Sequence, residues 1–157
     1  MPIGRVVNSV KDVLAVIIEI IESAKEEIVF LTPPSLLFLA GTFGSMQSTK
    51  LFIQNGGMVR GIVPISRVNI ERARIQLDIG EDLRHSDQIH EVFMLLGDKQ
   101  QSISAMNIGV QEYTLDTPIT AFWSDSPAYA EYLLTSFENA WSEAVPAEER
   151  IKELKQG

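Results

Sequence analysis

His90 and Asn107 are the residues whose types and spacing most suggest chemistry in this chain. His90 opens an apolar run, and Asn107 closes a second run in which apolar and polar residues alternate. A histidine can act as a nucleophile or as a metal ligand near neutral pH. The polar corner Gly97-Asp98-Lys99 separates the two runs, so the pattern predicts a β-hairpin over residues 90–107 with a buried first strand.

This hairpin resembles the signature of the phospholipase D superfamily, in which HxKxxxxD is followed by a GSxN-type tetrapeptide on the next strand. His90 matches the histidine and Asn107 matches the final asparagine. Val92 stands in place of the lysine, Gly97 in place of the aspartate, and Ser104-Ala105 in place of Gly-Ser. In that family the histidine attacks phosphorus and the lysine binds phosphate oxygens. The resemblance therefore implies a relative that kept the fold and lost its charge clamp on a phosphodiester.

Around the hairpin, amphipathic helices alternate with apolar strands. We expect strands over 28–31, 58–64 and 119–124, and helices over 9–25, 35–55, 66–79, 127–141 and 146–155. Ser66 is the expected cap of the third helix. Gly41 and Gly44 predict either a break in the second helix or a close approach of another backbone. The order predicts an α/β fold with a mixed sheet and helices on both faces.

The length and the resemblance together predict the organisation of the domain. A chain of 157 residues is expected to form a single domain over 1–157. The resemblance makes it one phospholipase D-like half, as in the sensing part of TrmB-type regulators. Halves in that family pair across a twofold axis, so the resemblance also implies a homodimer.

The composition excludes several classes of function. A formal charge of -8 without a cluster of Lys and Arg argues against direct nucleic-acid contact by this domain. The absence of cysteine excludes disulfides and thiolate metal sites. The longest apolar run, Val13 to Ile21, contains Glu19 and is too short to cross a bilayer, and no leader pattern opens the chain. We therefore expect a cytoplasmic protein without a membrane partner.

The candidate ligand-binding residues lie where parallel strands are expected to end and beside the hairpin. They are Ser35, Ser66, Arg84, His85, His90, Ser104 and Asn107. An arginine and two histidines could hold a small anionic or hydroxylated effector. The sequence thus predicts a non-catalytic ligand-sensing or dimerisation module of a signalling or transcription-regulatory system, with no cofactor. Simpler structural roles are an exposed loop histidine at 85, a histidine at 90 bonded to backbone, and pairing of Arg84 with Asp82 or Asp87.

Two alternatives stay open. The first is a phosphodiesterase in which His90 from two subunits meets in a homodimer and Lys99 or Lys50 replaces the missing lysine. The second is an interaction module that docks a partner through the helix bearing Trp141 or through the terminal helix. No metal site is expected, because His85 and His90 with their neighbouring carboxylates make a poor ligand set.

Overall fold

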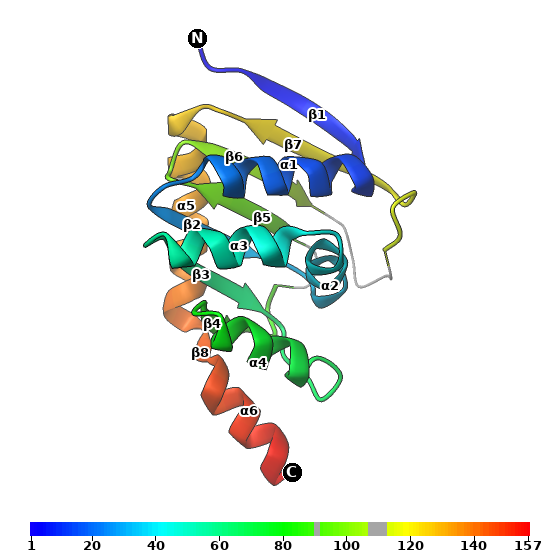
Figure 1. Ribbon diagram of the computed structural model, residues 1–157, viewed down its shortest axis with the longest axis vertical. Helices are drawn as coiled ribbons and strands as arrows, with labels where there is room; N and C mark the ends of the chain where they lie inside the picture. Colours follow the sequence, from blue (N-terminus) through cyan, green and yellow to red (C-terminus); the bar gives the residue numbers. More distant parts are fainter. Residues whose placement is uncertain (90–91, 107–112) are drawn as a thin grey trace.

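The computed structural model describes residues 1–89, 92–106 and 113–157. In this part of the chain one sheet runs in the order β1-β7-β6-β5-β2-β3-β4-β8 (Figure 1). The strands are β1 (Gly4–Ser9), β2 (Glu27–Leu31), β3 (Met58–Val63), β4 (Asp82–His85), β5 (Val92–Gly97), β6 (Gln101–Met106), β7 (Pro118–Ser124) and β8 (Val145–Pro146). The neighbours β2, β3 and β4 are parallel and the other pairs are antiparallel. The predicted mixed sheet is confirmed.

Helices cover both faces of this sheet, as predicted. One face carries α1 (Val10–Ser23), α2 (Pro34–Thr42), α3 (Ser45–Gln54) and α4 (Ile70–Asp78), whereas α5 (Pro127–Glu143) crosses the other (Figure 1). The short α6 (Ala147–Gln156) packs beside β4. Two apolar clusters fill the layers, one between the sheet and α1 to α4 and one beneath α5. The central strand β5 contributes to both clusters because its residues alternate between the faces.

The helix boundaries follow from local chemistry. The Oγ atom of Ser9 accepts the N–H of Asp12 and caps α1, and Ser126 caps α5 in the same way through Tyr129. The predicted helix over 35–55 is two helices, because Gly44 adopts φ +113° between α2 and α3. No backbone of the described residues approaches Gly41 closely; a Cβ at this position would instead collide with the guanidinium of the Arg72 side chain.

Three features of the secondary structure differ from the expectation. The helix expected from Ser66 begins at Ile70, because residues 66–69 form a separate turn in which Asn69 accepts the N–H of Ser66. The strands β1 and β4 were not predicted, and neither was the two-residue β8. Both β1 and β8 are edge strands, and β4 is bounded by β3 and the short β8. Their residues are largely polar or exposed, so they lack the long apolar run that indicates a central strand.

The predicted hairpin is confirmed over its described residues. The strands β5 and β6 pair antiparallel from Val92 opposite Met106 to Gly97 opposite Gln101. Residues 98–100 join the two strands, and Asp98 and Lys99 both adopt positive φ in a turn closed by the bond from the N–H of Gln100 to the carbonyl of Gly97. None of the helices in the described ranges is long and apolar enough to cross a membrane.

Candidate functional site

A pocket of about 630 Å³ lies at the edge of the sheet where the parallel strands β2 and β3 end. The start of α2, the end of β3, the turn before α4 and the inner side of α4 supply its walls. The described lining residues are Pro34, Ser35, Leu37, Leu39, Val63, Val68, Asn69, Glu71, Arg72, Ala73, Gln76 and Tyr113. The carboxyl ends of parallel strands are the usual place for a ligand in open α/β sheets. The cavity therefore lies at the edge of the sheet where the sequence analysis expected parallel strands to end.

Backbone geometry at this edge holds the pocket open. Pro33 and Pro34 end the path of β2 and start α2, since proline suits the first turn of a helix. On the facing wall, Asn69 donates from Nδ2 to the carbonyl of Pro64 at 2.9 Å and accepts the N–H of Ser66 at 2.7 Å. These bonds fix the turn between β3 and α4. The mouth of the pocket thus lies between the start of α2 and the hydrogen-bonded turn between β3 and α4.

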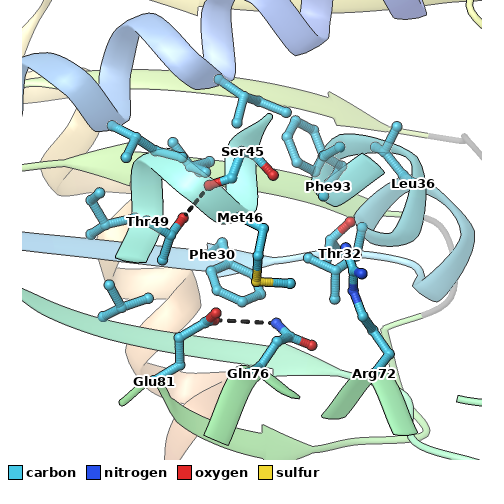
Figure 2. A pocket seen from close by; sticks show the side chains of 18 residues that line it. Phe30, Thr32, Leu36, Ser45, Met46, Thr49, Arg72, Gln76, Glu81 and Phe93 are labelled. Atoms are coloured by element: carbon cyan, nitrogen blue, oxygen red, sulfur yellow. Dashed lines mark hydrogen bonds between the residues drawn. The ribbon is translucent and has the colours of Figure 1, made fainter. Parts of the chain in front are cut away.

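A buried polar cluster adjoins the base of the pocket, which Arg72 and Gln76 line. Arg72 and Gln76 project from one side of α4, and Glu81 follows directly after Gly80, which ends the helix with φ +107° (Figure 2). The Nε2 atom of Gln76 donates to Oε1 of Glu81 at 3.2 Å. Burial raises the pKa of Glu81 to about 7, although the bond from Gln76 and the charge of Arg72 act against that rise. Burial also lowers the pKa of Arg72.

All three side chains border a second, smaller cavity of about 50 Å³ between the sheet and helices α1 to α4, which we call the inner cavity. Figure 2 shows this inner cavity with Phe30, Met46 and Phe93 around the polar cluster. Arg72 and Gln76 line both cavities, so they separate the open pocket from the apolar interior.

The positions of the phospholipase D signature have structural roles here. Val92 is half-buried and packs against the apolar cluster beneath α5. At Gly97, an added Cβ would lie 2.7 Å from Cγ2 of Ile20, so α1 leaves no room for the aspartate of the motif. His90 and Asn107 lie outside the described residues. Their described neighbours Val92 and Met106 lie at the same edge of the sheet as the pocket.

The other candidate residues are spread over several parts of the fold. Ser35 lines the pocket at the start of α2. Ser66 belongs to the braced turn, where its Oγ accepts the N–H of Val68, and it is not among the described lining residues. Ser104 lies on β6 between Met94 and Phe122, on the face that α5 covers. A direct role of each in binding stays a prediction.

Arg84 and His85 point to opposite faces of β4. The guanidinium of Arg84 lies 4.0 Å from the ring centroid of Trp141 and donates to the carbonyl of Trp141 at 2.8 Å. His85 is buried on the other face, where Nδ1 accepts the N–H of Ile65 at 2.8 Å and Nε2 lies 3.2 Å from Asp87. Burial lowers the pKa of His85. Both side chains therefore have partners inside the protein: Trp141 for Arg84, and Ile65 and Asp87 for His85.

Sequence reasoning missed the cluster of Arg72, Gln76 and Glu81. A polar residue at the inward position of a helix was the available signal, since Gln76 follows Ala73 by three residues on the buried side of α4. The described residues contain no group of three or more histidine or carboxylate side chains placed to hold a metal ion.

Comparison with solved structures shows that the chain has a phospholipase D-like fold. Nuc from Salmonella typhimurium, a phospholipase D family member, superposes with a TM-score of 0.72 and 16% identity over 93% of this chain and 98% of Nuc. NucT from Helicobacter pylori gives 0.72 and 11% over 93% of this chain and 99% of NucT. No protein-family model matches the chain, and no curated protein matches its sequence.

The archaeal chromatin protein TrmBL2, whose structure shows a novel mode of DNA binding, is a third structural neighbour. It superposes with a TM-score of 0.67 and 16% identity over 91% of this chain and 54% of TrmBL2. The chain therefore spans about half the length of TrmBL2. These neighbours confirm the fold that the hairpin resemblance implied.

Proposed function

We propose that this chain is a non-catalytic ligand-sensing module of a signalling or transcription-regulatory system. The observation that carries the proposal is the pocket of about 630 Å³ at the carboxyl ends of β2 and β3, with a buried polar cluster at its base. A volume of this size fits a small organic molecule, and a few polar groups in an apolar pocket are typical of specific binding sites. In this proposal the effector is a small molecule, and the protein uses no cofactor.

The residue at the lysine position of the signature favours binding over hydrolysis. Val92 offers no charge to a phosphate, and the described lysines lie elsewhere. Lys99 is at the hairpin corner, roughly 20 Å from Val92 along an extended strand. Lys50 lies on α3, which covers the face of the sheet rather than its edge. Neither Lys99 nor Lys50 of the same chain therefore lies at the place of the missing lysine.

The overlap with half of TrmBL2 supports a regulatory role. TrmBL2 binds DNA, and this chain covers about half of that protein. The formal charge of -8 makes the present chain a poor surface for phosphates. In our proposal the chain senses the effector, and a partner or another segment makes any contact with DNA.

Closing the mouth of the pocket tests ligand binding. Val68 lies at the rim and is 96% exposed, so Val68→Trp should obstruct the pocket without disturbing the core. We expect metabolites that raise the Tm of the wild type by several degrees to raise that of Val68→Trp much less. Ile75→Trp is the matched control, since Ile75 is exposed on α4, which follows the turn bearing Val68, and is not among the lining residues. Equal shifts in all three proteins would refute binding in this pocket.

The alternative function is a phosphodiesterase that uses His90 in a homodimer. The superposition over 98% of Nuc, a phospholipase D family member, favours this alternative. Hydrolysis of bis-nitrophenyl phosphate by the wild type, compared with His90→Ala, decides between the two. Our proposal expects no turnover above background in either protein. Turnover that disappears in His90→Ala would establish the hydrolase instead.

A further inference from the structure

Gln76 is a buried amide at the boundary between the open pocket and the inner cavity. Its side chain is 2% exposed and lines both spaces together with Leu37 and Arg72. A ligand that reaches the base of the open pocket therefore lies next to Gln76 and Arg72.

The amide of Gln76 has one satisfied end and one unsatisfied end. Its Nε2 donates to Glu81, whereas its buried Oε1 has no hydrogen-bond partner among the described residues. Figure 2 shows this oxygen directed away from Glu81. An ionised Glu81 accepts hydrogen bonds and cannot donate them, so it fixes this orientation of the amide. A buried acceptor without a partner is costly, and a ligand that supplies a donor removes that cost.

The charges around this base do not favour an anion. Arg72 is the one cation among the described lining residues of the pocket, and Glu71 lines the same pocket. Glu81 adds a second carboxyl beside Gln76, and its charge acts on Arg72. A guanidinium has several N–H groups arranged in a plane, so Arg72 can donate to a neutral carbonyl or hydroxyl as well as to an anion.

We propose that this pocket takes an uncharged ligand whose polar head donates to Oε1 of Gln76 and accepts from the guanidinium of Arg72. This inference rests on the proposed ligand-sensing function and specifies its ligand class. Primary amides are the simplest heads that carry a donor beside an acceptor. The apolar body of the ligand lies against Leu37, Leu39 and Val63, which line the pocket beside the two polar side chains.

Three probes with the same six-carbon body test the polar head. Hexanamide both donates and accepts, hexanoate only accepts and is anionic, and hexylammonium only donates and is cationic. Titrations are followed by the backbone amide shifts of the pocket residues at pH 8, where Glu81 is mostly ionised. We expect hexanamide to bind about tenfold more tightly than either charged probe, which is the effect of about one hydrogen bond.

Three variants show whether the preference for hexanamide depends on the amide of Gln76 or on a general effect of substitution in this region. Gln76→Leu keeps a buried side chain of similar size and should abolish the preference for hexanamide. Arg74→Leu, at an exposed position of the same helix, should retain it. In Glu81→Gln the new amide can donate as well as accept, so the amide of Gln76 is no longer held in one orientation. The preference for hexanamide over hexanoate should therefore become smaller.

Tighter binding of hexanoate, or an unchanged preference in Gln76→Leu, would overturn the assigned ligand class. A lack of binding by all three probes would also overturn it. None of these results decides whether the pocket binds a ligand at all, because the comparison of Val68→Trp with Ile75→Trp tests that separately. The failure of this inference is therefore distinguishable from the failure of the proposed function.

Discussion

Glu81 makes the stability of this protein depend on pH. Its pKa rises from 4.5 to about 7 on folding, so between these values the unfolded chain releases a proton that the folded chain keeps. Stability therefore falls as pH rises through this window and is constant above it. Each pKa unit corresponds to about 1.4 kcal/mol, so the total loss is on the order of 3 kcal/mol.

Replacing Glu81 by glutamine should remove this dependence. The unfolding free energy of the wild type should fall by about 3 kcal/mol relative to that of Glu81→Gln as the pH rises from 4.5 to 7. Urea unfolding at several pH values measures this difference. His85 acts in the opposite direction below its unfolded pKa, because its lowered pKa makes acid destabilising. Since His85 is present in both proteins, the difference between the two curves isolates Glu81. Parallel curves would contradict the assigned burial.

Arg84 was predicted to bind a ligand, but its described contacts show a role in packing. Its guanidinium stacks on Trp141 and donates to the carbonyl at the same residue. We expect Arg84→Lys to lose about 1 kcal/mol of unfolding free energy, because lysine keeps the charge but not the planar stacking. Chemical unfolding measures that loss. Weaker binding of hexanamide in Arg84→Lys would instead support the role in ligand binding that the sequence predicted.

At the scale of elements, the hairpin is fastened to the turn between α1 and β2. Asp98 accepts the backbone N–H groups of Lys25, Glu26 and Glu27 at 2.8 to 2.9 Å. Burial alone would raise the pKa of Asp98, but these donors outweigh it and lower the pKa. Asp98 lies one position after the place of the motif aspartate, at the end of β5 far from the pocket. It therefore stabilises the arrangement of the elements and is not among the described lining residues of the pocket.

Removing this carboxylate should destabilise the fold. Asp98→Gly keeps the positive φ of 54° without strain and loses all three acceptor contacts, so we expect a loss of about 2 kcal/mol. Asp98→Asn should lose less, because one amide oxygen still accepts while the NH₂ group faces an N–H donor. Stability that Asp98 contributes is present above its unfolded pKa and is lost as pH falls through its lowered folded pKa. Equal stability of the two variants in urea would contradict this explanation.

The elements that the sequence predicted correctly are those with a long periodic pattern. The apolar spacing of α1, the alternation in β6 and the proline start of α5 each depend on local chemistry that the sequence displays. The strand β4 lacks such a signal, because only Leu83 joins the apolar core whereas Arg84 and His85 are satisfied by Trp141 and Ile65. Tertiary contacts determine that strand, and single-sequence patterns do not contain them.

Of the described candidate site residues, the sequence placed Ser35 at the pocket, whereas the polar residues at its base were not predicted. The pocket lies at the carboxyl ends of parallel strands, as topology requires, and Ser35 lines it. Its polar base comes from Arg72 and Gln76 on a helix whose pattern is weakly amphipathic, and Glu81 beyond the helix stop is bonded to Gln76. These residues become neighbours only when α4 packs onto the sheet, so their proximity could not be read from their spacing.

At the scale of the whole molecule, the homodimer implied by the resemblance makes a prediction about one edge of the sheet. Met106 ends β6 at the edge where β5 begins, and it is 73% exposed. Val68 is also exposed at the rim of the pocket on this edge. Large apolar side chains exposed at one edge favour association, and a twofold contact would cover both copies of each residue.

We therefore expect light scattering to give twice the mass of one chain, and Met106→Asp to shift the protein to the monomer. A buried carboxylate in each copy would face its symmetry mate, and two unpaired like charges are costly in an interface. Tyr132→Asp is the matched control, because Tyr132 is equally accessible on the outer side of α5 and should leave the dimer intact. Dissociation by Tyr132→Asp alone would move the interface to the α5 face. A wild type that is monomeric at high concentration would remove the homodimer from the proposal, and with it the two-histidine arrangement that the phosphodiesterase alternative requires.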